Sequence, residues 1–162
     1  MNILYHASPH TDLQIIKPTQ ILLEDNVPIG KYVFATDNIK YASMYLVKLG
    51  HATLMEPNGK NPHIIIQSEP DVFSATDKGG AIYFLPDTTF KETPQNGLEQ
   101  TERVSRESVE PIDKRIYKSS IEAMSEMGIK IYFVNRKTFK LFLETKDDEG
   151  LLNLIQPYKV AH

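Results

Sequence analysis

The sequence contains no cysteine, and this absence excludes several kinds of site. Disulfide bonds, thiolate zinc sites and a cysteine nucleophile all need that residue. A chain without disulfides suits a reducing compartment, and we expect a cytoplasmic protein. An apolar run long enough for a signal peptide or a membrane span is also missing, so we expect no membrane partner.

The chain also lacks an excess of positive charge. Eighteen lysines and arginines stand against 21 aspartates and glutamates, which gives a net charge of −3. Nucleic-acid-binding proteins usually carry a basic excess, so this balance argues against tight nonspecific binding, although it leaves room for a local basic groove. The 162 residues are 41% hydrophobic, which is enough for a core without cross-links. We therefore expect one domain over residues 1–162.

Strand-like segments outnumber helical ones along the chain. Runs rich in β-branched and aromatic residues predict strands at 2–6, 32–35, 63–67, 72–74, 81–85, 103–110 and 130–134. Apolar periodicity and end signals predict helices at 38–49 and 113–127, and a helical region from 136 that breaks near 147–150. The helices flank the strands and do not alternate with them regularly, which predicts an α+β fold.

A histidine follows an apolar strand start in the segment Leu4-Tyr5-His6-Ala7-Ser8. The small residues after it permit a ligand to approach the backbone, whose N–H and C=O groups can then bind an amide. The imidazole of His6 could hold a ribose hydroxyl. The same segment also fits an ordinary strand with a half-buried histidine, and the sequence leaves both interpretations open.

A strand-to-helix junction occupies residues 34–38, and Tyr41 and Tyr45 follow on the expected helix. Their spacing of four residues places both rings on one helix face. A tyrosine at such a junction can stack on a planar ring, but it can equally pack at the rim of the core.

Glu110 ends the segment Glu107-Ser108-Val109-Glu110, and Pro111 follows it directly. Proline stops regular strand pairing, so the Glu110 carboxylate is expected at a strand end. An exposed glutamate is common, and this segment alone also fits a plain surface position.

Taken in order, these segments resemble the three motifs of the diphtheria-toxin-like and poly(ADP-ribose) polymerase branch of the ADP-ribosyltransferases. His6 with Ser8 resembles the first motif, residues 34–45 the second, and residues 108–110 the third. The resemblance implies an ADP-ribosyltransferase-like fold, with mostly antiparallel split β-sheets and flanking helices around an NAD cleft. It also implies NAD as substrate, release of nicotinamide, and transfer of ADP-ribose to an unknown macromolecular acceptor, either protein or nucleic acid.

The resemblance further implies a role for each matched residue. His6 would bind a hydroxyl of the nicotinamide-side ribose, and Glu110 would stabilise the cation-like ribose carbon as nicotinamide leaves; both are the expected catalytic residues. Tyr45 would stack on the nicotinamide ring. The remaining expected NAD-binding positions are the backbone of Ala7, the ring of Phe34, and the side chains of Ser8, Thr36 and Tyr41. No metal is expected, because no histidine pair has the spacing of a metal site.

Four positions depart from the family pattern. Ala7 stands where glycine is usual, and Phe34 stands where tyrosine is usual, so a hydroxyl is lost. Pro111 restricts Glu110 to an extended conformation. Ser108 is neither the acid nor the amide typical of the branch that modifies arginine, so arginine is a poor candidate acceptor.

These departures leave other functions open. The chain could be a catalytically degenerate binding module on the same fold, or an NAD-consuming enzyme similar to an RNA 2′-phosphotransferase. It could also be an unrelated α+β domain. Acceptor choice would depend on the expected loops 17–30, 55–62 and 86–103, of which the first could instead be a short helix. The oligomeric state is not fixed by the sequence.

Overall fold

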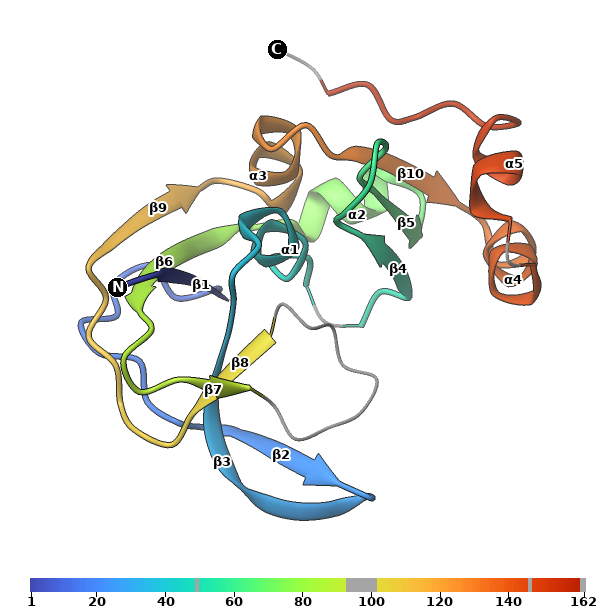
Figure 1. Cartoon of the computed structure of the whole chain (residues 1–162). Helices are drawn as coiled ribbons and strands as arrows, with labels where there is room; N and C mark the ends of the chain where they lie inside the picture. Colours follow the sequence, from blue (N-terminus) through green and yellow to red (C-terminus); the bar gives the residue numbers. More distant parts are fainter. Residues whose placement is uncertain (49, 93–101, 146, 161–162) are drawn as a thin grey trace. The chain divides into compact units, whose positions relative to one another are not determined.

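The computed structural model describes residues 1–48, 50–92, 102–145 and 147–160, and it is α+β, with mostly antiparallel open sheets and short helices (Figure 1). Two compact units divide the chain, and each combines two separate stretches. The first holds Met1–Ala42 and Gly80–Ile116, and the second holds Ser43–Gly79 and Tyr117–His162. The expectation of a single domain over residues 1–162 stays a prediction. Across the described ranges, no helix has the length and apolar character needed to cross a membrane.

The first unit is built on a seven-stranded sheet. Its path runs β7-β8-β3-β1-β6-β9, and β2 pairs with β3 beside this path. The strands are β1 (Ile3–Ser8), β2 (Gln20–Glu24), β3 (Val27–Thr36), β6 (Gly80–Pro86), β7 (Lys91–Glu92), β8 (Glu102–Ser105) and β9 (Asp113–Tyr117), the last of which ends in the second unit. The strands expected at 32–35 and 81–85 are confirmed within β3 and β6, and the strand expected at 2–6 is confirmed from Ile3 onward, in β1.

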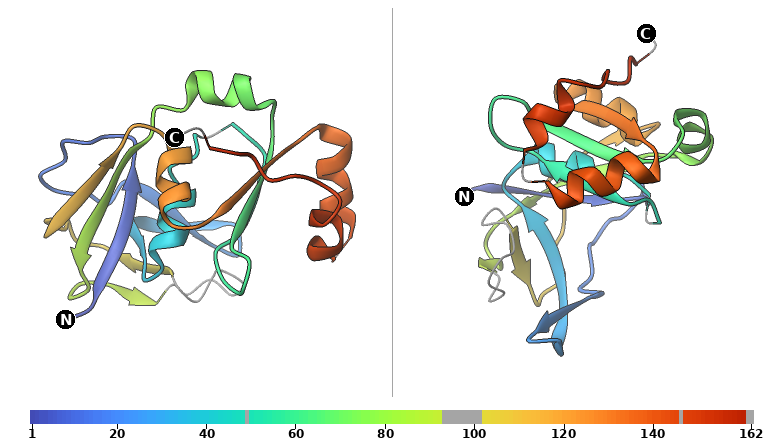
Figure 2. Two further views of the ribbon diagram at one scale, coloured as in Figure 1. Left: turned by 90° about the horizontal axis from the view of Figure 1, so that it is seen from above. Right: turned by 90° about the vertical axis from the view of Figure 1, so that its right-hand side faces the viewer.

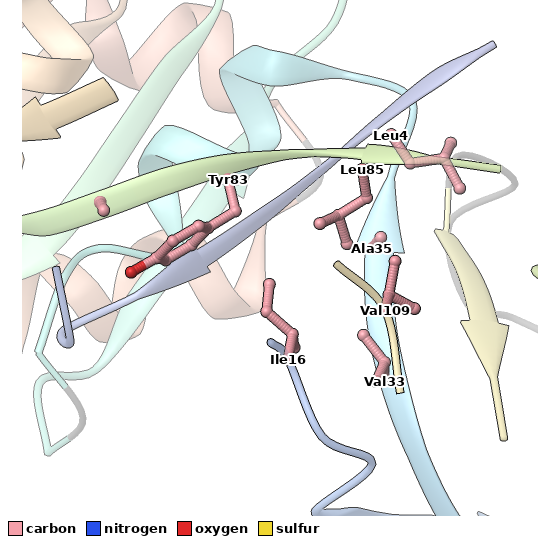
Figure 3. Packing of buried hydrophobic residues seen from close by; sticks show 8 residues of the cluster. Leu4, Ile16, Val33, Ala35, Tyr83, Leu85 and Val109 are labelled. Atoms are coloured by element: carbon pink, nitrogen blue, oxygen red, sulfur yellow. The ribbon is translucent and has the colours of Figure 1, made fainter. Parts of the chain in front are cut away.

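The larger hydrophobic cluster of this unit lies on one face of the sheet. Successive strand residues point to opposite faces, so Leu4 of β1 and its partner Leu85 of β6 share a face. Tyr83 is fully buried on the same face, and Ile16 and Val109 cover it (Figure 3). Ile16 and Val109 exchange two backbone hydrogen bonds, of 2.8 and 2.9 Å, which fix that cover in place.

The stretch 17–30 is neither a loop nor a short helix, because a β-hairpin of β2 and β3 occupies most of it. Asp25 and Asn26 form the turn with φ values of 50° and 64°. Aspartate and asparagine tolerate this left-handed conformation better than most residues, and two such residues in a row form the turn that suits a hairpin's twist.

The second unit contains a three-stranded sheet in the order β10-β5-β4. Strand β4 spans Thr53–Glu56, β5 spans His63–Gln67 and β10 spans Lys130–Val134. β10 pairs parallel to β5, whereas β4 is antiparallel to β5. The strands expected at 63–67 and 130–134 are confirmed with the same bounds. Within the expected loop 55–62, Met55 and Glu56 belong to β4.

Helices cover both faces of this smaller sheet (Figure 2). Phe139 and Phe142 of α4 (Arg136–Glu144) and Leu152 of α5 (Asp148–Leu152) pack on Ile65 and Tyr132. On the opposite face, Phe73 of α2 (Pro70–Thr76) contacts Phe133 of β10, with ring centroids 5.2 Å apart. The helical region expected from 136 is confirmed, and its break lies just before α5, whose first residues are Asp148 to Gly150.

The strand expected at 72–74 is wrong, because these residues lie inside α2. Pro70 occupies the first turn of this helix, where the missing N–H costs nothing and the fixed φ is already helical. The proline before this short apolar run therefore indicates a helix start, whereas the β-branched Val72 favours a strand.

The helix expected at 113–127 is wrong in its first part. Residues Asp113–Tyr117 form β9, and α3 begins only at Ser120 and ends at Glu126. Ser119 caps α3 by accepting a hydrogen bond from the Glu122 N–H, while the Glu122 carboxylate accepts one from the Lys118 N–H. This reciprocal capping separates strand from helix.

Two further elements are shorter than expected. Helix α1 covers Ile39–Met44 and not 38–49, of which Leu49 lies outside the described residues. The strand expected at 103–110 is limited to β8, and Val109 forms an isolated bridge to Ile16. Of the expected loop 86–103, residues 93–101 lie outside the described part, while Lys91 and Glu92 form β7.

Candidate functional site

His6 projects from β1 near the centre of the larger sheet. In the antiparallel register it lies opposite Tyr83 of β6, so both side chains are on the core face of the sheet. In the pairing of β1 with β3, Tyr5 lies opposite Thr36. At the next residue of β1, the imidazole of His6 contacts the backbone of β3.

The Nδ1–H of His6 donates a hydrogen bond of 2.7 Å to the backbone carbonyl of Phe34. A carbonyl only accepts, so the proton of the neutral ring is on Nδ1 and the lone pair is on Nε2. Within the described part of the chain, Nε2 has no hydrogen-bond partner. Burial lowers the pKa of the His6 imidazole below its ordinary value, and the hydrogen bond to Phe34 offsets part of this effect. His6 therefore presents a neutral acceptor nitrogen.

Phe34 joins the His6 site through its backbone, whereas its ring lies elsewhere. Its neighbours Val33 and Ala35 belong to the core cluster on the His6 face, so the Phe34 side chain points to the opposite face. There the ring packs beside Leu22, in the cluster that also contains Tyr32 and Val104. The structure does not bring the Phe34 ring onto the face of His6.

Ser8 and Thr36 are buried, and each hydroxyl has a local partner. The Ser8 Oγ accepts a hydrogen bond from the His10 N–H, and the Thr36 Oγ1 accepts one from the Asn38 N–H. Thr36 lies opposite Tyr5, on the face away from His6. Ala7 alternates with His6 and Ser8 along β1, so its methyl group also points away from His6.

The two tyrosines of the second motif fall on different sides of the division between the units. Tyr41 is half-buried and belongs to the first unit, whereas Tyr45 is 46% exposed and belongs to the second. Tyr45 also lies just beyond the last residue of α1. A convergence of Tyr45 with His6 and Glu110 stays a prediction.

Glu110 is exposed, and it follows the buried Val109. Val109 points into the core cluster that contains Tyr83, and in an extended segment the next side chain points the opposite way. The backbone of the third motif is thus anchored under the sheet face that carries His6. The Glu110 side chain points away from the core cluster that contains Val109.

An open hollow of about 400 Å³ lies beside the start of β1. Its polar lining includes Asp37 after β3, Asp87 after β6, and Arg103 of β8, together with the rings of Tyr5 and Phe90. None of the expected catalytic or NAD-binding side chains lines this hollow. No local sequence pattern indicates this hollow, because its lining comes from segments far apart along the chain.

Comparisons of the chain with protein-family models, with curated proteins and with solved structures find no match. Among the described residues, no group of three or more His, Cys, Asp or Glu side chains has the arrangement of a metal site. The expectation that the site works without a metal stays a prediction.

Proposed function

We propose that the protein is an NAD-dependent ADP-ribosyltransferase that releases nicotinamide and transfers ADP-ribose to a macromolecular acceptor. The observation that carries this proposal is the hydrogen bond between the His6 Nδ1–H and the Phe34 carbonyl. It joins the first and second motifs of the resemblance, which are far apart in the sequence. It also orients an acceptor nitrogen, Nε2, that suits a ribose hydroxyl.

The lowered pKa of His6 suits this chemistry. In the proposed reaction the bond between nicotinamide and the ribose C1′ breaks, and nicotinamide leaves with the electron pair. Positive charge then develops on the ribose, and a neutral imidazole does not repel it. The carboxylate of Glu110 would stabilise this charge until the acceptor's nucleophile forms the new bond at C1′.

A binding module that has lost catalysis is the second candidate, and two observations favour it. The Phe34 ring packs into a hydrophobic cluster on the face away from His6, so it does not form a wall beside that residue. The Glu110 side chain is exposed, and solvent weakens the effect of a carboxylate on a nearby charge.

Release of nicotinamide from NAD tests the proposal, measured by chromatography for the wild type, Glu110→Gln and His6→Asn. We expect Glu110→Gln to reduce the rate by about 100-fold, as for the loss of one group that stabilises a transition-state charge. Glu107→Gln is the matched control, because Glu107 is exposed in the same segment, and it should keep the wild-type rate.

Calorimetry with NAD separates the two candidates. NAD binding without nicotinamide release, unchanged by Glu110→Gln, would contradict the transferase. Absence of NAD binding by the wild type at millimolar concentration would also contradict the transferase and would favour the binding module. Equal rates for wild type and Glu110→Gln would remove Glu110 from the mechanism.

A further inference from the structure

A second hollow, of about 620 Å³, lies in the second unit and is lined by the connection of β4 to β5, the end of α4 and the start of α5. We call it the α4–α5 groove. Apolar side chains of Leu54, Phe142 and Leu143 contribute to its lining. Phe142 is buried at 3% exposure, whereas Leu143 is 61% exposed. The volume is within the range of about 300–1,000 Å³ that is usual for ligand-binding clefts.

The rim of the α4–α5 groove is strongly acidic. Four carboxylates, from Glu56, Asp147, Asp148 and Glu149, face one cation, Lys60, among the described lining residues. Within the described ranges these carboxylates form no ion pair. Carboxylates therefore outnumber cations among the described residues that line this groove.

His63 adds a buried side chain to the same groove. It is 5% exposed, and its Nδ1–H donates a hydrogen bond of 2.7 Å to the Asn61 carbonyl. Its other ring nitrogen, Nε2, has no partner in the described part of the chain. The groove thus offers an unpartnered imidazole nitrogen and carboxylate acceptors beside an apolar floor.

We propose that the α4–α5 groove binds an arginine-bearing segment of a partner protein. A guanidinium has five N–H donors and no acceptor, which complements a rim of carboxylates. The aliphatic part of the arginine side chain packs on apolar surface while its charge stays at the rim, and Leu143 supplies such surface. A nucleic acid or an acidic peptide is repelled by the same rim.

The first test uses the full chain and a fluorescein-labelled hexapeptide of alternating arginine and leucine, followed by fluorescence anisotropy. Binding should weaken as salt is raised, because the rim charges are exposed to solvent. Asp148→Asn with Glu149→Gln should weaken binding by about tenfold at low salt, as expected for the loss of one half-buried and one exposed ion pair. The control, Asp12→Asn with Glu24→Gln, removes two exposed carboxylates outside the groove and should change affinity less than about twofold.

The second test examines the apolar floor. Leu143→Ala should weaken binding of the same peptide by about threefold or more, because part of the leucine surface is buried by the ligand. Leu154→Ala is the control, since Leu154 is 80% exposed and does not line the groove. Neither leucine supports the core, so both variants should keep the wild-type circular dichroism spectrum.

Three results would overturn the proposal. The first is equal binding of a peptide in which glutamate replaces arginine. The second is displacement of the peptide by spermidine at the peptide's own concentration, which would indicate a site for small polyamines. The third is equal affinity for the arginine peptide in the double variant Asp148→Asn with Glu149→Gln and in its control double variant. None of these results depends on NAD chemistry, because the groove lies in the second unit and His6 in the first.

Discussion

The imidazole of His6 donates a 2.7 Å hydrogen bond to the backbone carbonyl of Phe34, 28 positions further along the chain. A side chain here binds a carbonyl at the place where β1 and β3 stop pairing with each other. Backbone carbonyls that are shielded from water need a donor, and in this sheet a titratable ring supplies it.

Loss of this hydrogen bond should destabilise the first unit. We expect His6→Ala to lower the free energy of unfolding by about 1–3 kcal/mol, because the Phe34 carbonyl is left without its donor. Urea denaturation followed by circular dichroism measures the change. His10→Ala is the control, since His10 is exposed, and its effect should stay within about 0.5 kcal/mol. Equal effects of the two variants would show that the hydrogen bond contributes nothing.

The lowered pKa of His6 should make stability depend on pH. In the unfolded chain the imidazole titrates near 6.5, so below that pH the unfolded state binds more protons than the folded state. The contribution of neutral His6 is therefore complete above pH 6.5 and is lost as pH falls toward the folded-state pKa. The NMR titration midpoint of the His6 ring should lie below 6.5, and His6→Asn should reduce the loss of stability on acidification. A midpoint at or above 6.5 would contradict the burial of the ring.

Gly79 and Gly59 form a matched pair for a test of close packing in the second unit. Both have positive φ, at 66° and 81°. A Cβ at Gly79 would lie 2.3 Å from the Tyr117 carbonyl oxygen, whereas a Cβ at Gly59 meets nothing within 4 Å. Alanine should cost about 1–2 kcal/mol at either position through backbone strain. Only Gly79→Ala should add a steric cost, visible as a larger drop in melting temperature, and equal drops would rule out the close approach.

The hydroxyl of Tyr83 should contribute to the stability of the first unit. It donates a hydrogen bond of 2.6 Å to the His10 carbonyl and accepts one of 3.0 Å from the Leu13 N–H. Tyr83→Phe leaves both backbone groups without this partner and should cost about 1–3 kcal/mol in urea denaturation. Tyr158→Phe is the control and should cost less than about 0.5 kcal/mol, since no partner of its hydroxyl occurs in the described ranges. Similar costs for both variants would contradict the role of the Tyr83 hydroxyl.

The sequence predicts strands well where one residue pattern dominates. Residues 63–67 and 130–134 are short, β-branched and aromatic, and their bounds agree with β5 and β10. Where local signals compete, the prediction depends on which one is weighted. Pro70 marks the start of α2, but the β-branched and aromatic residues after it favoured a strand. Ser119 and Glu122 mark the start of α3, but apolar periodicity favoured a longer helix.

The site is less predictable than the strands because it depends on long-range register. Alternation within β1 was visible in the sequence, but the face shared by His6 and Tyr83 follows from the pairing of β1 with β6. The same register places the Phe34 ring on the other face, which no local pattern indicates. The hollow beside β1 and the α4–α5 groove likewise combine residues from distant segments.

The parallel pairing of β5 with β10 also affects the order in which the protein can fold on the ribosome. β5 ends at Gln67, but its partner β10 begins at Lys130, after every residue of the first unit has been made. The nascent chain can therefore complete the first unit while β5 still lacks its parallel neighbour, for a time on the order of a second at ordinary rates of translation. During that interval the Ile64–Ile66 edge of β5 is a surface that a chaperone would have to protect.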